Sequence, residues 1–110
     1  MELRTSQNGK ELTVFLKGEL DHHGARKARE NTDALIHQKM PSVLKLNFSG
    51  VTFMDSSGIG LILGRYRTMK LFGGKLKVVC VPPGLKRIME LSGLCCLDIM
   101  EGDGDLNESA

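Results

Sequence analysis

Apolar and polar positions in the N-terminal part of the chain predict a β-hairpin followed by a helix. Residues 11–17 are mostly apolar or β-branched, which is typical of a strand. The turn sequence Asn8-Gly9 precedes them, so residues 2–7 can pair with this strand as a hairpin. In residues 25–39 a thin stripe of apolar side chains recurs at near-helical spacing, and Pro41 follows. This segment therefore predicts a helix that covers a sheet from one side.

The rest of the chain continues the alternation of strands and helices. Ser49-Gly50 predicts a turn, Gly73-Gly74 predicts the C-terminal cap of the longest helix, and Pro82-Pro83 opens a shorter one. The predicted elements are, in order, a strand over 42–48, a helix over 56–72, a strand over 75–81, a helix over 84–91 and a strand over 94–100.

The predicted order is β-β-α-β-α-β-α-β. This order favours an α/β fold in which helices form the crossovers between parallel strands. We therefore expect a single domain over residues 1–100, with a mixed, mostly parallel β-sheet and the hairpin at one edge. A chain of 110 residues is long enough to bury a core without disulfides or metals. Residues 101–110 are acidic and rich in glycine, and we expect them to form a disordered tail.

The composition narrows the class of protein. Hydrophobic residues make up 41% and charged residues 25% of the chain, as in ordinary soluble proteins. No apolar run approaches the roughly 20 residues of a membrane-spanning helix, and Met1-Glu2-Leu3-Arg4 lacks the apolar block of a secretory signal. We therefore expect a cytoplasmic protein without membrane insertion. Cys80, Cys95 and Cys96 are odd in number, and their spacings favour reduced structural thiols.

The net charge of +2 divides into −4 on residues 101–110 and +6 on the rest of the chain. An excess of basic residues is typical of nucleic-acid binding. Here, however, the basic residues are scattered and are accompanied by only one Tyr and four Phe. We therefore expect a solvated surface and no direct binding to nucleic acid.

Residues 53–66 form the most informative stretch, because a strand gives way to a helix there across Ser56 and Ser57. The first N–H groups of a helix have no partner inside it, so a serine hydroxyl at that point is a natural cap. The same N–H groups can hold a phosphate. Ser56 therefore has both a structural and a regulatory interpretation. Asp21 is placed in a similar way to cap the helix predicted over residues 25–39.

The helix after Ser56 has two different sides. Gly60 and Gly64 lie on one narrow line, although a glycine inside a helix costs about 1 kcal/mol relative to alanine. Either close packing on the sheet or the approach of a partner to the bare backbone would account for them, and the sequence favours neither. The side predicted to pack on the sheet carries Ile59, Ile62, Leu63, Tyr66 and Met69.

Four short patterns suggest cofactor or catalytic sites but lack the partners that such sites need. The glycines of residues 58–64 are similar to a dinucleotide fingerprint, yet no acid follows about 20 residues later to bind a ribose. Asp21-His22-His23 is a single cluster, which cannot hold two metal ions. Residues 103–107 imitate a calcium loop without its glycine, and no acid–histidine pair is placed to activate Ser56. We therefore expect no enzyme activity, no cofactor and no metal.

Several motifs together resemble the anti-sigma factor antagonists of the STAS domain family, in register over most of residues 10–97. The Asp-Ser-Ser-Gly segment is specific because it lies inside so long a shared run. The motifs are Gly18-Glu19-Leu20-Asp21-His22-His23, Phe53-Met54-Asp55-Ser56-Ser57-Gly58-Ile59-Gly60, Ile62-Leu63-Gly64-Arg65-Tyr66, and Lys86-Arg87 with Ser92-Gly93-Leu94.

This resemblance implies a protein without catalytic activity that is switched by phosphorylation. The phosphate acceptor of the family is the first serine of the motif, which corresponds to Ser56. An anti-sigma factor that is also a serine kinase would phosphorylate it, and the ATP and magnesium used belong to that kinase. A membrane-linked serine phosphatase would reverse the reaction. The unphosphorylated form would bind the anti-sigma factor and release a sporulation sigma factor.

The expected partner-binding surface surrounds the acceptor serine. Two alternatives stay open, namely a STAS module of another sigma-regulatory cascade, such as a stress cascade, and a STAS domain that senses a small ligand. The residues expected to contact the partner are Asp21, Asp55, Ser57, Gly58, Ile59, Gly60, Gly64 and Arg65.

Overall fold

The computed structural model describes residues 1–101, apart from the side chain of Cys95. The tail predicted over residues 101–110 therefore lies, beyond Glu101, outside the described residues. The elements are β1 (Glu2–Asn8), β2 (Glu11–Leu20), α1 (His22–Lys39), β3 (Val43–Met54), α2 (Ser56–Leu71), β4 (Lys75–Val79), α3 (Pro83–Leu91), the 3₁₀ helix η1 (Leu94–Leu97) and β5 (Met100–Glu101).

The strands form one five-stranded sheet in the order β1-β2-β3-β4-β5. The edge strand β1 is antiparallel to β2, and the two form the predicted hairpin, with Gly9 in the left-handed region at φ 64°. The remaining neighbours pair in parallel. The predicted α/β fold, with a mixed, mostly parallel sheet and helices as crossovers, is therefore confirmed.

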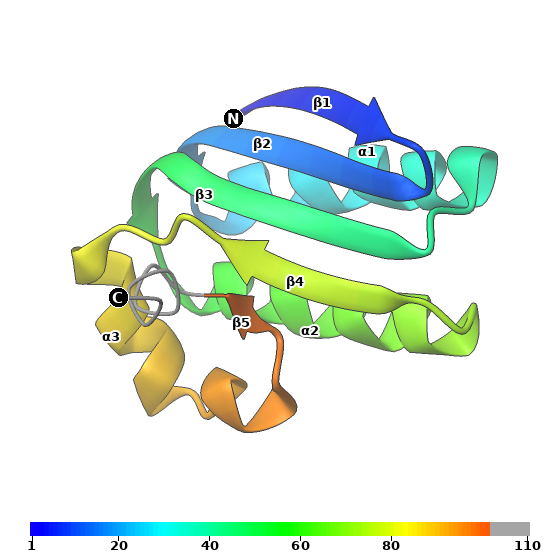
Figure 1. The fold of residues 1–110 in the computed structure, drawn as a ribbon. Coiled ribbons are helices and arrows are strands. Elements are labelled where there is room, and N and C mark those ends of the chain that lie inside the picture. The colour runs from blue at the N-terminus through cyan, green and yellow to red at the C-terminus, as the bar shows by residue number, and fades with distance from the viewer. Residues whose placement is uncertain (102–110) are drawn as a thin grey trace.

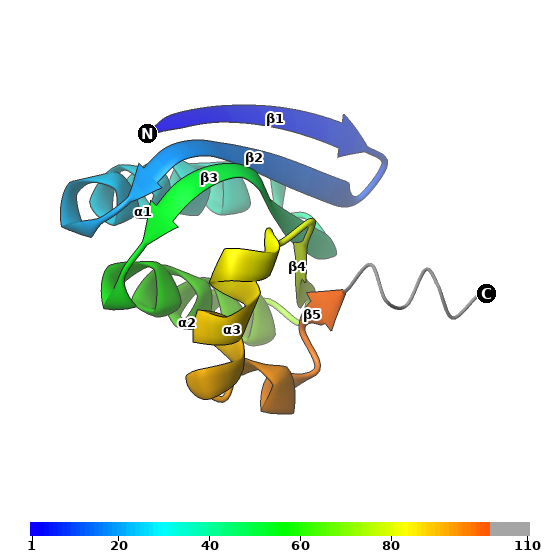
Figure 2. The ribbon, with the colours of Figure 1, turned by 90° about the vertical axis from the view of Figure 1, so that its left-hand side faces the viewer.

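The helices and the sheet form separate layers. Figures 1 and 2 show α1 and α2 side by side on one face of the sheet, and α3 with η1 beyond β4. None of the helices in residues 1–101 is both long and apolar enough to span a membrane.

The core lies between the sheet and the two long helices. Every second side chain of β2 and of the first part of β3 points into it, which is the period expected of strands with one buried face. Ala28, Thr32 and Ile36 of α1 close it from the other side. The buried strand residues are Leu12, Val14, Leu16, Leu20, Leu44, Leu46 and Phe48.

The segment predicted as the last strand is mostly helical, so that prediction is wrong. Residues 94–97 form η1, and the strand is only Met100–Glu101. Gly93 and Asp98, at φ 81° and φ 58°, bracket η1 with left-handed backbone that no strand adopts. A short apolar run cannot be assigned to a strand or a buried helix by its spacing alone.

The turn predicted at Ser49-Gly50 is also wrong, because β3 continues through it to Met54. The parallel pairing with β2 shifts by one residue in this region, between Phe15 and Lys17. A Cβ on Gly50 would lie 2.9 Å from the carbonyl oxygen of Leu16. Glycine therefore permits a close backbone approach at an irregularity in the sheet, not a chain reversal.

Three further boundaries differ from the predictions. β2 extends to Leu20, so α1 begins at His22, three residues earlier than predicted. β4 ends at Val79 because Cys80 has a left-handed φ of 55°. Cys80 is exposed and lies outside β4, although the strand was predicted to continue to residue 81.

Candidate functional site

Two neighbouring parallel strands end at the same edge of the sheet, and each leads into a helix. Leu20, the last residue of β2, is paired with Met54, the last residue of β3. One aspartate follows each strand, Asp21 before α1 and Asp55 before α2. The pairing register therefore brings the N-termini of both long helices together.

Each aspartate caps its helix through a side-chain oxygen. Oδ1 of Asp21 accepts a hydrogen bond of 2.8 Å from the backbone N–H of Gly24, so the predicted cap at Asp21 is confirmed. The hydrogen bond from Gly24 lowers the pKa of Asp21. Desolvation of the carboxylate raises this pKa and His23 lowers it, so that the net shift is downward.

The cap of α2 is Asp55 and not a serine. Oδ1 of Asp55 accepts a hydrogen bond of 2.8 Å from the backbone N–H of Ser57. The interpretation of Ser56 as the cap is therefore wrong, since Ser56 is the first residue inside the helix. The side chain of Ser56 is consequently not needed for capping and lies exposed, whereas Ser57 is half-buried.

The buried side of α2 differs from the one predicted. Ile62 and Met69 are buried as expected, and Ile59, Leu63 and Tyr66 are half-buried and pack against the core. Gly58, Leu61 and Arg65 also face the interior. A search for apolar side chains misses Gly58 and Arg65, because glycine has no side chain and arginine is charged. The buried residues of α2 are Gly58, Leu61, Ile62, Arg65 and Met69.

Gly58 is a packing residue. A Cβ at this position would clash with the side chain of Met54 and would lie 3.1 Å from Cδ2 of Leu20. Gly58 therefore lets the start of α2 lie against the ends of β2 and β3. Gly58 is buried, and its direct contact with a partner stays a prediction.

Arg65 is only 6% exposed and joins the two helices from within. Its Nε lies 3.0 Å from Oδ1 of Asp33 on α1, a distance that makes an ion pair, although the N–H direction does not align for a hydrogen bond. Burial lowers the pKa of Arg65, Asp33 opposes that shift and the like charge of Arg29 adds to it. Arg65 is buried in the isolated chain, and its contact with a partner stays a prediction.

Gly60 and Gly64 face open space. A Cβ at either position would meet no heavy atom within 4 Å. The close-packing interpretation of these two glycines is therefore wrong. Ser56 and Gly60 lie one turn apart on the exposed side of α2, with Gly64 another turn further.

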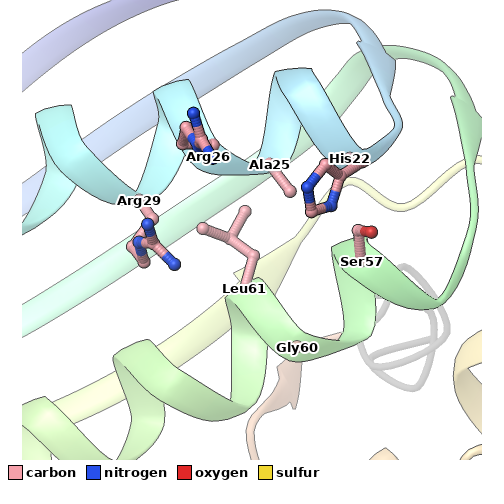
Figure 3. Close-up of a pocket in the computed structure, with 7 residues that line it drawn as sticks. All are labelled: His22, Ala25, Arg26, Arg29, Ser57, Gly60 and Leu61. Carbon is pink, nitrogen blue, oxygen red and sulfur yellow. The ribbon is translucent and has the colours of Figure 1, made fainter.

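An open cleft of about 330 Å³ lies between the first turns of α1 and α2. Figure 3 shows His22 facing Ser57 across it, with Leu61 rising from α2 and Arg29 extending from α1 into the gap. Three basic side chains line the cleft, and no acidic one does. The complete lining is His22, Ala25, Arg26, Arg29, Ser57, Gly60 and Leu61.

Arg26 and Arg29 were not predicted as site residues. They belong to a polar helix with many charged side chains, and nothing local distinguishes them. Only the position of α1 beside α2 brings them to Ser57 and Gly60. In residues 1–101 no three His, Cys, Asp or Glu side chains are grouped so that they could hold a metal ion.

Comparison with known proteins matches residues 2–102 to the STAS domain. The anti-sigma F factor antagonist of Paenibacillus polymyxa is 41% identical over 83 residues, which are 76% of this chain and 71% of that protein. The anti-sigma-B factor antagonist of Bacillus subtilis (strain 168) is 32% identical over 88 residues, which are 80% of this chain and 79% of that protein.

Two solved structures share the whole fold at 27% sequence identity. The anti-sigma factor antagonist SpoIIAA in its unphosphorylated form has a TM-score of 0.80 and covers 98% of this chain and 95% of its own. The Bacillus cell fate determinant SpoIIAA in the phosphorylated form has a TM-score of 0.73 and covers 98% of both chains.

Proposed function

The chain belongs to the STAS domain family, among its anti-sigma factor antagonists, and we propose that phosphorylation of Ser56 switches its binding to an anti-sigma factor. The unphosphorylated protein binds an anti-sigma factor that is also a serine kinase, and this binding releases a sporulation sigma factor. Phosphorylation ends the binding, and a serine phosphatase restores it. The observation that carries the proposal is the exposed Ser56 directly after the capping Asp55.

The choice of Ser56 over Ser57 rests on exposure and on capping. A kinase must enclose the accepting hydroxyl, and Ser56 is exposed while Ser57 is half-buried and lines the cleft. The backbone N–H of Ser57 is also the group that Asp55 caps. Ser56 is therefore the accessible acceptor. One solved relative is described as phosphorylated, which supports this kind of switch in the family.

A phosphate at Ser56 is compatible with the folded domain. It adds about −1.5 to −2 charges at a helix N-terminus, where the helix dipole favours negative charge. The switch is therefore a change of surface charge and shape and requires no refolding.

The same phosphate opposes a partner that fits the neutral surface. Each added charge repels a carboxylate of the partner at about 6 Å by roughly 3 kcal/mol at an effective dielectric of 20. The phosphate also occupies space directly over the exposed side of α2. The proposed partner surface consists of Asp21, Asp55, Ser56, Ile59, Gly60 and Gly64.

The proposal assigns no catalytic step to this chain. ATP and magnesium are bound by the kinase, and the protein supplies only the accepting hydroxyl. We place the switch in the cytoplasm, where sigma factors act.

A stress cascade is the second candidate, because the anti-sigma-B factor antagonist of Bacillus subtilis is 32% identical to this chain. The two candidates differ only in the anti-sigma factor that is bound. The higher identity of 41% to the anti-sigma F factor antagonist of Paenibacillus polymyxa favours the sporulation cascade. Binding measured against both anti-sigma factors of the source organism distinguishes them.

The test compares Ser56→Ala with Ser57→Ala as the matched control. Each variant is incubated with the anti-sigma factor kinase, ATP and magnesium, and the phosphate is located by mass spectrometry. We expect stoichiometric phosphate on Ser57→Ala and none on Ser56→Ala, whose binding to the anti-sigma factor should persist. Stoichiometric phosphate on Ser56→Ala would contradict the assignment of Ser56 as the acceptor.

Ser56→Asp should weaken the binding to the anti-sigma factor. An unchanged affinity would show that charge at this site is not the switch.

A further inference from the structure

We infer that the basic cleft between α1 and α2 is a docking pocket for an acidic side chain of the anti-sigma factor. This inference rests on the proposed function and adds the chemistry of a second contact. Arg26 and Arg29 would bind the carboxylate, and the first turn of α2 would form the facing wall with Ser57 and Gly60.

The charges around the cleft are unbalanced. Its lining contains Arg26, Arg29 and His22 and no acidic residue. The ion pairs found within residues 1–101 join Lys17 with Glu2, Lys45 with Glu11, and Arg65 with Asp33. Among the described residues, Arg26 and Arg29 therefore have no ion-pair partner. Their side chains are exposed and stay free for an external anion.

The shape of the cleft also fits a carboxylate side chain. Arg26 and Arg29 are three residues apart on α1, so they lie on the same side of the helix. An arginine can donate two parallel hydrogen bonds to a carboxylate. Leu61 supplies an apolar wall for the methylene groups of the entering side chain. The cleft, with a volume of about 330 Å³, is large enough to admit that side chain together with water.

Gly60 keeps the cleft accessible from the partner side. It lines the cleft, and a Cβ there would meet nothing within 4 Å. A partner approaching Ser56 along the exposed side of α2 therefore reaches the cleft over bare backbone. A partner in one orientation can therefore contact both Ser56 and the cleft.

A single carboxylate of a partner protein fits the basic cleft better than a polyanion such as nucleic acid does. Asp21 and Asp55 precede the two helix turns that line the cleft. A row of phosphates would have to lie against these carboxylates, and like charges in such close positions repel. A folded protein can present one acidic side chain to the cleft and a basic or neutral surface to the aspartates. Opposite charges in adjacent positions also determine the orientation of the partner.

The test measures affinity for the anti-sigma factor kinase by calorimetry, with Arg26→Gln and Arg29→Gln as variants. Arg4→Gln is the matched control, because Arg4 is exposed on β1 and lies outside the cleft. We expect each cleft variant to bind roughly tenfold more weakly at about 0.05 M salt. The difference from the wild type should shrink at about 0.5 M salt, where exposed charges are screened. Arg4→Gln should bind like the wild type.

Thermal melting of the same variants checks that the fold is intact. Arg26 and Arg29 are exposed, and Arg29 is a like charge near the buried Arg65. The melting temperature of Arg29→Gln should therefore stay equal or rise slightly. If a variant binds more weakly but keeps its melting temperature, the loss of affinity comes from the changed cleft and not from unfolding.

Several results would overturn the inference. Unchanged affinity of both cleft variants, while Ser56→Asp still weakens binding, would overturn the docking pocket and leave the proposed function standing. An equal loss in Arg4→Gln would show a general effect of net charge. Saturable binding of inorganic phosphate or a short DNA duplex that the cleft variants abolish would identify phosphate as the ligand instead. Absence of binding by the wild type would overturn the proposed function together with this inference.

Discussion

Neighbouring residues of α2 serve different purposes because each turns to a different side of the helix. Ser56 is exposed and Ser57 lines the cleft, although they are adjacent in sequence. Gly58 is buried against Met54, whereas Gly60 faces open space. The same residue type therefore has a packing role at one position and an accessible surface two residues later, on the opposite side of the helix.

Gly60→Ala should raise the free energy of unfolding by about 1 kcal/mol, because alanine favours a helix interior and its Cβ meets no neighbour here. Its affinity for the anti-sigma factor should fall, since the methyl group enters the proposed interface. Urea denaturation and calorimetry measure the two effects. Gly58→Ala is the matched control and should lower stability by about 1–3 kcal/mol through overpacking. A loss of stability in Gly60→Ala would instead favour close packing at Gly60.

The start of each long helix combines a structural cap with an exposed surface. Asp21 and Asp55 occupy equivalent positions, one residue after paired strand ends. Their carboxylates accept hydrogen bonds from backbone N–H groups of the first turn. The side chains that follow are therefore not needed for capping. The fold thus prepares two helix starts in the same way and places them side by side.

The cap at Asp21 predicts a dependence of stability on pH. Its pKa is lowered in the folded protein, whereas an unfolded aspartate has a pKa of about 3.9. The charged cap therefore stabilises the protein above about pH 4, and this contribution is lost as the pH falls through the lowered pKa of the folded state. Asp21→Asn keeps a capping oxygen but does not titrate.

Urea denaturation of the wild type and of Asp21→Asn between about pH 6 and pH 2 measures this contribution. We expect the difference in unfolding free energy to be largest near neutral pH and to shrink in acid. A difference that is independent of pH would contradict the role of the charged cap.

At the scale of the whole molecule, the site depends on how α1 is held against α2. Arg65 and Asp33 form the ion pair between these helices, and Leu61 and Ala25 line the cleft between them. A shift of α1 would change the cleft and the spacing of the two capped helix starts. Arg65 is therefore a positioning residue for the candidate site.

Removing one partner of the Arg65–Asp33 pair should destabilise the fold. Asp33→Ala leaves a buried guanidinium without its counter-charge, and we expect a loss of about 2 kcal/mol. This is less than for a fully buried pair, because the side chain of Asp33 is 36% exposed. Arg65→Met in the same chain should recover most of the loss, since no uncompensated charge then stays buried.

A double-mutant cycle by urea denaturation tests this coupling. Additive effects of the two substitutions would contradict it. The Arg65→Met variant should also retain strong binding to the anti-sigma factor if its fold is intact, and a selective loss of binding would show that Arg65 contacts the partner.

Local patterns in the sequence determined much of this protein. The order of strands and helices, the hairpin at Asn8-Gly9 and the cap at Asp21 follow from spacing and cap chemistry within a few residues, and the structure confirms them. The two serines at the start of a helix were identified in the same way. Such features depend on neighbours in the chain, so the sequence alone is sufficient.

Only the tertiary structure decided which residues are accessible and which lie together. The pairing of Leu20 with Met54 sets the two helix starts side by side, and the packing of α1 brings Arg26 and Arg29 to the first turn of α2. The burial of Arg65, the open space at Gly60 and the helical form of residues 94–97 likewise depend on contacts between distant segments. Spacing along one element cannot specify these contacts, because they are set by what packs against that element.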